Sequence, residues 1–225
     1  MRLMCLDTCS QTVSVAAMED GKLCLEKWSL QKTNHSQVLL PLIAEITDEL
    51  GWTQESVDCW AVVNGPGSFT GVRIGVSTVR ALAHGWNKPI VAVNSLETIA
   101  AQVTEKSVGI IPMLDARRGQ VYAALYERNE TGMEEILKPT ACSFAEMIQQ
   151  PQDREYILIG DGAQANKDSA VSDNMRFAAP EQQYIHAGAA AEIAWDRWQK
   201  GEVYTYRYLE PLYIREPQAV RDLKK

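Results

Sequence analysis

The residues with the strongest potential for binding chemistry form a glycine-rich turn, Asn64-Gly65-Pro66-Gly67-Ser68-Phe69-Thr70-Gly71. The turn follows an apolar run, Cys59–Val63, and leads into a helix-like segment, an order that can present backbone N–H groups to an anion. It is not a P-loop, because Val72 stands where that motif requires lysine. Its glycines give GxGxxxG, which is one residue longer than the dinucleotide-binding fingerprint. On these grounds the turn is as consistent with a structural role as with ligand binding.

The longer string NGPGSFTGVRIG is far more specific than its glycines alone. With HSQVLLPLI before it and VNSLETIA after it, it closely resembles the TsaB (YeaZ) family, and weaker echoes follow at LDARRGQVYAALY, GDGA and PLYIR. The resemblance implies an α/β fold with two ribonuclease-H-like lobes of the actin-like and sugar-kinase ATPase (ASKHA) type. It also implies a partner subunit of the machinery that makes threonylcarbamoyladenosine beside the anticodon of tRNA.

The composition indicates a globular protein that needs no disulfide or metal to stabilise its core. The 225 residues are 46% hydrophobic and 23% charged. The net charge of −7 argues against this chain being the main tRNA-gripping surface, although Arg215, Arg221, Lys224 and Lys225 form a local basic cluster. The five cysteines include no CxxC pair and are expected to be buried free thiols. With no leader and no apolar run of about 18 residues, we expect a cytoplasmic protein without a membrane partner.

The pattern of apolar runs divides the chain into two lobes and a tail. Three antiparallel strands are predicted at the N-terminus, and the same order restarts near residue 108, as in a duplicated fold. We expect an N-terminal lobe at 1–105, a C-terminal lobe at 106–205, and a tail at 206–225 that returns toward the N-terminal lobe. The expected strands cover 2–8, 11–18, 23–30, 108–114, 119–127 and 133–137.

Two helical segments of the N-terminal lobe, 34–50 and 71–86, carry more apolar or small side chains than one core needs. The first is apolar round much of its circumference, and the second has an apolar stripe flanked by small residues. Arg73 and Arg80 lie two turns apart on one side, where they either face solvent or pair with a partner. The predicted partner-binding residues are His35, Val38, Leu39, Leu42, Ile46, Val72, Arg73, Val76, Val79 and Arg80.

Two acidic residues, Asp7 and Asp115, each follow an apolar run at the end of an expected strand. In actin-like and sugar-kinase-like ATPases an acid at this place lies near metal and phosphate, usually beside a glycine. The turn after Asp7 contains no glycine, and Ala116 replaces the glycine expected beside Asp115. Local turn hydrogen bonds are therefore the favoured role of Asp7. Any nucleotide cleft is predicted to be degenerate and to involve Asp7, Thr8, Gly67 and Asp115.

The resemblance also locates a missing metal site. The related catalytic subunit carries NHLEGH, whose two histidines bind a metal ion from one helix face. Ser95 and Ile99 occupy the two ligand positions here, and isoleucine cannot ligate. We therefore expect no metal and no catalytic residue in this chain. The chain alone is expected to bind no cofactor, and ATP enters only through the complex.

The favoured function is a non-catalytic scaffold that binds a TsaD-type catalytic subunit and acts with a TsaE-type ATPase. The resemblance implies that this complex transfers threonylcarbamoyl to tRNA, which the chain meets through the complex. Alone, its helices are expected to pair in a homodimer. One alternative is a phosphotransferase of the sugar- or acetate-kinase type, which needs intact phosphate turns. The other is a metallopeptidase, which needs metal ligands or a nucleophile–base pair.

Overall fold

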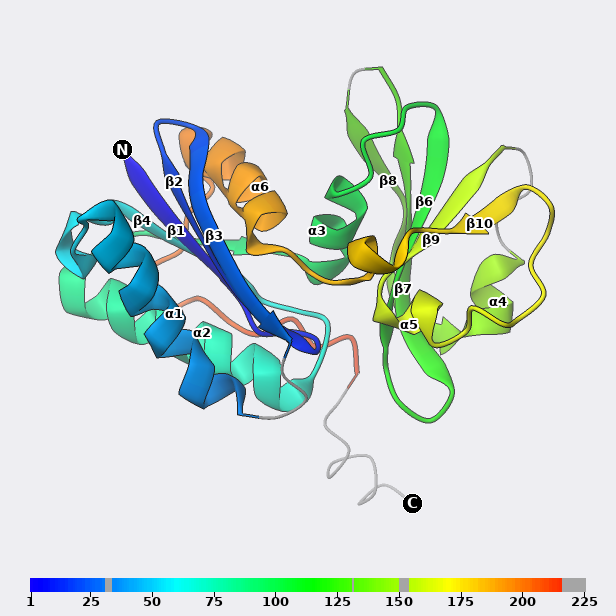
Figure 1. Ribbon diagram of the computed structural model, residues 1–225, viewed down its shortest axis with the longest axis horizontal. Helices are drawn as coiled ribbons and strands as arrows, with labels where there is room; N and C mark the ends of the chain where they lie inside the picture. The colour runs from blue at the N-terminus through cyan, green and yellow to red at the C-terminus, as the bar shows by residue number, and fades with distance from the viewer. Residues whose placement is uncertain (31–33, 131, 150–153, 216–225) are drawn as a thin grey trace.

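Two five-stranded sheets stand side by side in the computed structural model, which describes residues 1–30, 34–130, 132–149 and 154–215 (Figure 1). The first sheet has the order β3-β2-β1-β4-β5. Its first three strands are antiparallel, and β4 and β5 continue the sheet parallel to β1. The strands of this sheet are β1 (Arg2–Asp7), β2 (Thr12–Glu19), β3 (Lys22–Leu30), β4 (Cys59–Val63) and β5 (Ile90–Val93).

The second sheet repeats the order of the first. Read from its other edge it runs β8-β7-β6-β9-β10, again with three antiparallel strands followed by two parallel ones. This repetition confirms the predicted duplication and gives the two ribonuclease-H-like lobes of an ASKHA-type fold. The strands are β6 (Val108–Asp115), β7 (Gln120–Arg128), β8 (Met133–Ser143), β9 (Tyr156–Ile159) and β10 (Met175–Phe177).

Helices cover both faces of the first sheet (Figure 1). Helices α1 (His35–Leu50) and α2 (Phe69–Trp86) lie on one face, over β2–β3 and β4–β1 respectively. Helix α6 (Ala187–Gln199) covers the opposite face and contacts all five strands of the sheet. No helix of the described segments is long and apolar enough to cross a membrane.

The position of α6 differs from the predicted lobe boundaries. The segment 106–205 was expected to form the C-terminal lobe, but α6 lies within it and packs on the N-terminal sheet. The physical reason is that β1, β2 and β4 are buried on both faces, so their second face needs a helical cover. Ala187, Ala190, Ala191 and Ala194 supply a flat apolar stripe that fits against the sheet.

Short helices occupy the space around the second sheet. Helix α3 (Ser95–Ala101) packs against α6 on one side and against β6 and β7 on the other. Helices α4 (Phe144–Ile148) and α5 (Asp161–Gln164) lie near β7–β8 and β6–β9, and the 3-10 turn η2 (Pro180–Gln183) contacts α5. The other 3-10 turn, η1 (Gln54–Ser56), belongs to the first lobe and contacts α2. One apolar core runs from the first sheet through α6 and α3 to the near face of the second sheet.

Helix starts explain most differences from the expected boundaries. Helix α2 begins two residues earlier than predicted, because the Ser68 side chain accepts a hydrogen bond from the Gly71 N–H and caps it. Asn94 caps α3, because its side chain accepts hydrogen bonds from the Leu96 and Glu97 N–H groups. Asn34 precedes α1 in the left-handed region without a side-chain cap, and Gly51 ends that helix as expected. Ser143 and Glu146 form a capping box at the start of α4.

The tail runs back along the first sheet and α2. Tyr204 forms an antiparallel bridge with Ile90, and Leu209 is buried. Asn64, in the glycine-rich turn, accepts from the Leu212 N–H at 2.7 Å and donates its side-chain amide to the Glu210 carbonyl at 3.1 Å. Residues 206–215 therefore lie against the N-terminal lobe. The basic residues Arg221, Lys224 and Lys225 lie outside the described residues.

Candidate interaction surface and interlobe site

The glycine-rich turn packs tightly on the backbone that follows β1. The Ser68 N–H donates to the Cys9 carbonyl at 2.7 Å, and the Thr8 hydroxyl donates to the Gly71 carbonyl at 2.7 Å. A Cβ on Gly67 would collide with the Cys9 carbonyl, and one on Gly71 with the Thr8 carbonyl. Both glycines are therefore required by close backbone approach. The N–H groups of Ser68 and Gly71, which could have faced an anion, bond within the chain.

Asp7 ends β1 and is fully buried. Its Oδ1 accepts a hydrogen bond from the Cys9 N–H at 2.9 Å, whereas its Oδ2 has no partner among the described residues. Burial raises the pKa of Asp7 to about 7, a shift that the hydrogen bonds from Cys9 and Thr8 and the charge of His186 only partly oppose. The predicted local turn hydrogen bond exists. Burial and the lack of a partner for Oδ2 nevertheless disfavour the ionised form of this carboxyl group.

Asp161 joins the turns of the two lobes. It is the first residue of α5, and its Oδ1 accepts from the Asp115 N–H at 3.0 Å. Burial is the main cause that raises the pKa of Asp161, and a hydrogen bond from the Gln11 side chain acts against it. Gln11 follows the Asp7 turn, so Asp161 links the turns after β1 and β6. Asp115 itself is exposed and accepts from the Arg117 N–H at 2.8 Å.

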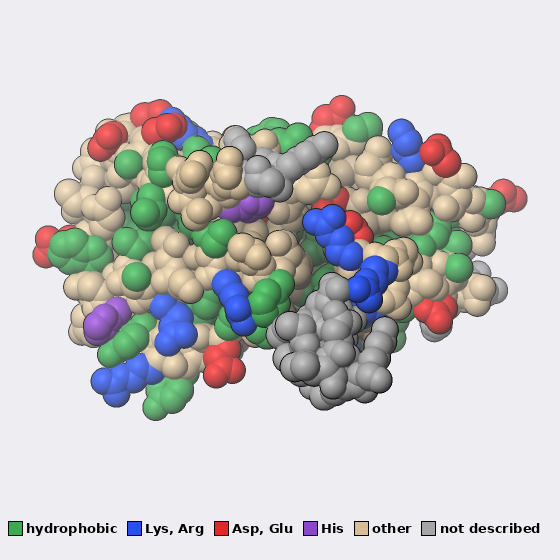
Figure 2. Space-filling model, turned by 90° about the horizontal axis from the view of Figure 1, so that it is seen from below, with side chains coloured by type: hydrophobic (Ala, Val, Ile, Leu, Met, Phe, Trp, Pro, Cys, Tyr) green, Lys and Arg blue, Asp and Glu red, His purple; other side chains and the backbone are tan. Residues whose placement is uncertain are grey.

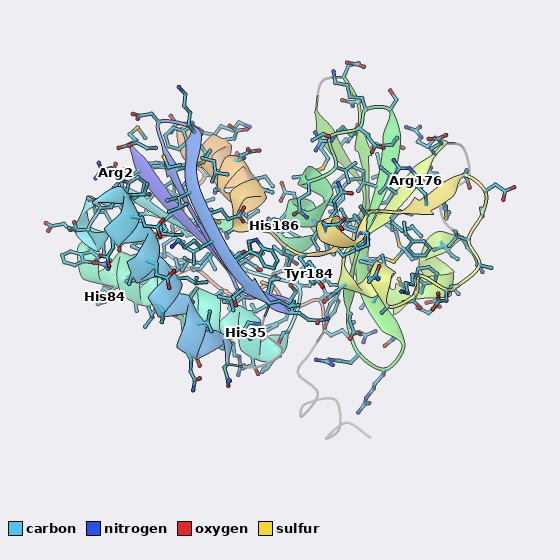
Figure 3. All side chains as sticks on the ribbon, viewed as in Figure 1. Arg2, His35, His84, Arg176, Tyr184 and His186 are labelled. Atoms are coloured by element: carbon cyan, nitrogen blue, oxygen red, sulfur yellow. The ribbon has the colours of Figure 1, made fainter. Side chains whose placement is uncertain are left out.

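A polar and aromatic group lies beside these turns, where the chain crosses from the second lobe back to α6. The His186 Nδ1 lies 3.6 Å from the Glu26 Oε1, and this contact raises the pKa of His186. The Trp28 ring stacks near Tyr184 and meets the His186 ring edge-on, with centroid separations of 6.3 and 5.6 Å. Figure 3 shows Tyr184 and His186 between the two lobes.

Sequence reasoning missed Asp161, Glu26 and His186 as members of this site. Asp161 did carry a signal, because it belongs to the GDGA string that echoes the family. Glu26 and His186 carried none, since the residues are 160 positions apart by number and only the crossing of α6 onto the first sheet brings them together.

The predicted partner-binding set is mostly wrong as a surface. Six of its members are buried in this chain's own core, with exposed fractions of 9% or less. Their periodic stripes face β1–β4 of the first sheet, because that sheet is itself apolar and needs helical cover. The six are Leu39, Leu42, Ile46, Val72, Val76 and Val79.

The remaining members lie at or near the surface. Arg73 and Arg80 are exposed, and Val38 is half-buried against the core. The His35 ring bonds through Nε2 to the Ser10 carbonyl at 2.9 Å, so it holds the first turn against the start of α1. A contact of these residues with a partner stays a prediction.

The surface that α1 and α2 do offer lies on their outward sides. Lys27 of β3 pairs with Glu45 at 3.1 Å and with Glu49, which sets that side of α1 over β3. Leu40 and Ala44 lie on the opposite side of α1, toward α2, by the spacing of the helix. Both are exposed, Leu40 by 55%. We define the outer helix face by its exposed residues Leu40, Pro41, Ala44, Ala81 and Gly85.

The two positions that correspond to metal ligands in the related catalytic subunit are fully buried in α3. The Ser95 hydroxyl donates to the Pro66 carbonyl and so ties α3 to the glycine-rich turn. Ile99 belongs to the core between the lobes. These residues fit the interior of the chain and not a coordination sphere. The absence of a bound metal stays a prediction.

Comparison with known proteins decides the family. Residues 29–195 match the family model described as TsaD, tRNA N6-adenosine threonylcarbamoyltransferase. A protein of Escherichia coli (strain K12), named tRNA threonylcarbamoyladenosine biosynthesis protein TsaB, is 31% identical over 99% of this chain and 98% of its own length. The chain belongs to the TsaB family. A Bacillus subtilis (strain 168) protein of the same name is 31% identical over 74% of each chain.

The fold agrees with the solved structures of this family. The structure titled "YeaZ from Pseudomonas aeruginosa" superposes with a TM-score of 0.83 at 27% identity, covering 94% of this chain and 99% of that one. The TsaB protein of Escherichia coli (strain K12) matches at nearly full length, whereas the threonylcarbamoyltransferase of Anaeromyxobacter sp. (strain Fw109-5) matches over 62% of this chain and 47% of its own. The expected family and the two-lobed fold are confirmed.

Proposed function

We propose that the chain is a non-catalytic partner subunit in threonylcarbamoyladenosine synthesis. It binds a TsaD-type catalytic subunit and, with a TsaE-type ATPase, supports transfer of threonylcarbamoyl to the tRNA adenosine beside the anticodon. The names of the relatives supply the pathway. The observation that carries the proposal is the outer helix face, because two adjacent helices leave apolar and small side chains uncovered there.

The residues at the interlobe turns favour a role without chemistry. The N–H of Ser68 and the N–H of Gly71 both bond within the chain, which leaves them unavailable to a phosphate. A sugar- or acetate-kinase mechanism would need such donors. The α3 positions that ligate metal in the catalytic relative are Ser95 and Ile99, both in the interior. In this proposal the chain binds no cofactor by itself, and ATP enters through the complex.

The outer helix face also accounts for the expected behaviour of the chain in the absence of its partner. Small residues such as Ala44, Ala81 and Gly85 allow another helix to approach closely, and Leu40 can then insert between them. The same face would pair two copies in a homodimer when the catalytic subunit is missing. A role on tRNA implies that the protein works in the cytoplasm.

The test is co-purification with a tagged TsaD-type subunit after a charge is placed on the outer helix face. Leu40→Glu should abolish capture of that subunit, because a carboxylate would be buried in an apolar contact. Ile136→Glu is the matched control, since Ile136 lies on β8 of the other lobe and is 46% exposed against 55% for Leu40. Undiminished capture by Leu40→Glu, with both variants folded, would refute the proposed interface.

A further inference from the structure

Two arginines below the first sheet are held in the same unusual way. Arg73 on α2 donates its Nε–H to the Tyr213 hydroxyl at 2.8 Å, and its guanidinium carbon lies 3.8 Å from the Phe69 ring centroid. Arg207 in the tail donates its Nε–H to the Tyr206 hydroxyl at 3.1 Å, with its guanidinium carbon 5.6 Å from the ring centroid. In both, the terminal Nη groups have no acceptor among the described residues.

Neither arginine is neutralised by an acid, although acidic residues outnumber basic ones in this chain by 29 to 22. Other exposed or half-exposed arginines do pair with carboxylates, as Arg2 does with Glu19 and Arg176 with Glu105. Arg80 also has no ion pair within the described ranges. Glu210 lies nearby in the tail, but no ion pair joins it to Arg73 or Arg207. The positive charge of this region is left available to an external anion.

Helix α2 and the tail together form one continuous surface, which we call the arginine–tyrosine strip. Its two ends are fixed by ring contacts: Phe69 with Tyr213 at 5.0 Å and His84 with Tyr206 at 4.1 Å. Figure 2 views the molecule from this side and shows Lys and Arg side chains interleaved with hydrophobic ones below the first sheet. The strip consists of Phe69, Arg73, Arg80, His84, Tyr206, Arg207, Tyr208 and Tyr213.

The strip lies on a different side of α2 from the outer helix face. Arg73, Arg80 and His84 follow one another at 7 and 4 positions along α2, and His84 contacts the tail. Ala81 and Gly85, by contrast, are turned away from the tail by the helical repeat. Along the helix axis, Arg73 and Arg80 are about 10 Å apart. A partner protein on the outer helix face would therefore leave the strip accessible.

We propose that the arginine–tyrosine strip binds the phosphate backbone of the tRNA on which the complex acts. This inference rests on the proposed function for the identity of the RNA. A guanidinium whose Nε–H is occupied still offers the four N–H bonds of its two terminal amino groups to phosphate oxygens, and the contact with the ring and hydroxyl holds it in place. Tyr208, which is 73% exposed, provides a ring on which an unpaired base can stack. Interleaved cations and aromatic rings fit RNA better than an acidic polypeptide, which offers no bases to stack.

The test measures binding of the full chain to an unmodified tRNA transcript by fluorescence anisotropy across a series of salt concentrations. The double variant Arg73→Gln/Arg207→Gln should bind about tenfold more weakly. Its plot of log affinity against log salt should be shallower by about 1.4 to 1.8, because each lost phosphate contact lowers the slope by about 0.7 to 0.9. The double variant Arg2→Gln/Arg176→Gln removes the same charge from ion-paired arginines and should stay within about twofold of the wild type.

Tyr208→Ala provides a variant whose folding is not in question, since the ring is mostly in solvent. It should weaken tRNA binding about fivefold or more. Equal weakening by both arginine pairs, no weakening by Arg73→Gln/Arg207→Gln, or no binding by the wild type would overturn the proposal. So would displacement of the tRNA by polyglutamate as readily as by polyuridylate. Capture of the TsaD-type subunit by the strip variants is measured in parallel, so that loss of RNA binding with capture intact contradicts only this inference.

Discussion

The pH dependence of stability should be governed by Asp7. Its folded pKa of about 7 lies above the ordinary value of 3.8, so the folded state holds this proton more tightly than the unfolded chain. Stability from a raised acid pKa is present at low pH and is lost as pH rises from 3.8 to 7, after which it is level. Between pH 5 and pH 8 the free energy of unfolding should therefore fall by about 2.5 kcal/mol from this group alone.

Two other groups at the interlobe turns, Asp161 and His186, have raised pKa values and act in the same direction. The pKa of His186 is raised by Glu26, so its stabilising charge is present at acidic pH and is lost as pH rises through its folded value. Asp7→Asn should remove most of the fall and leave the smaller parts that Asp161 and His186 contribute. The asparagine side chain keeps an oxygen that can accept the hydrogen bond from the Cys9 N–H. The quantity compared is the change in unfolding free energy between the two pH values, not the absolute stability of the variant.

The assay is urea unfolding at pH 5 and pH 8 for the wild type, Asp7→Asn and Asp173→Asn. Asp173 is an exposed carboxylate of the second lobe, so its variant should keep the wild-type difference between the two pH values. A wild-type stability that is level between pH 5 and pH 8 would refute the reasoning. An Asp7→Asn variant that falls as steeply as the wild type would do the same.

Three further substitutions test the packing. Val76→Arg should cost about 4 kcal/mol or more and lower the thermal midpoint sharply, because it places a charge in the chain's own core; a near-native midpoint would mean that Val76 is not core. Gly71→Ala should cost about 2 kcal/mol in urea unfolding, since its Cβ would meet the Thr8 carbonyl, whereas Gly85→Ala, with open space around it, should be neutral or slightly stabilising. Arg197→Ala should cost about 2 kcal/mol by breaking the bidentate pair with Glu97 that joins α6 to α3, and a loss below about 0.5 kcal/mol would contradict that role.

Much of the architecture was predictable because local patterns and global packing agree. The runs at β1 and β6 are mostly apolar and coincide with the expected strands within a residue or two. The capping box at Ser143 and the stop at Gly51 follow from side-chain and backbone preferences that need no tertiary context. The restart of the strand pattern after about residue 108 indicated the duplication.

The candidate surface was less predictable, and Val76 shows why. Helical periodicity tells which side chains share one side of a helix, but not whether that side meets the chain's own sheet or another protein. Val72, Val76 and Val79 made a convincing stripe, and the stripe turned out to be the internal one. Leu40 lies outside that stripe and is 55% exposed, so the proposed contact with a partner depends on Leu40 and not on the stripe.

The placement of α6 could not be derived from local pattern for a related reason. An alanine-rich helix is compatible with either sheet, and only the two-sided burial of β1 and β2 requires it to lie on the first. The contact between Glu26 and His186 depends on this placement of α6, so local sequence patterns could not predict it.

That crossing has a consequence for any attempt to divide the molecule. A fragment ending after α3 would contain all five strands of the first sheet and helices α1 and α2, but the face of its sheet that α6 covers would be exposed. The complementary fragment would carry α6 with nothing of its own to dock on. Neither fragment should fold stably by itself. The two fragments, when co-expressed, should associate, because each supplies the apolar surface that covers the other.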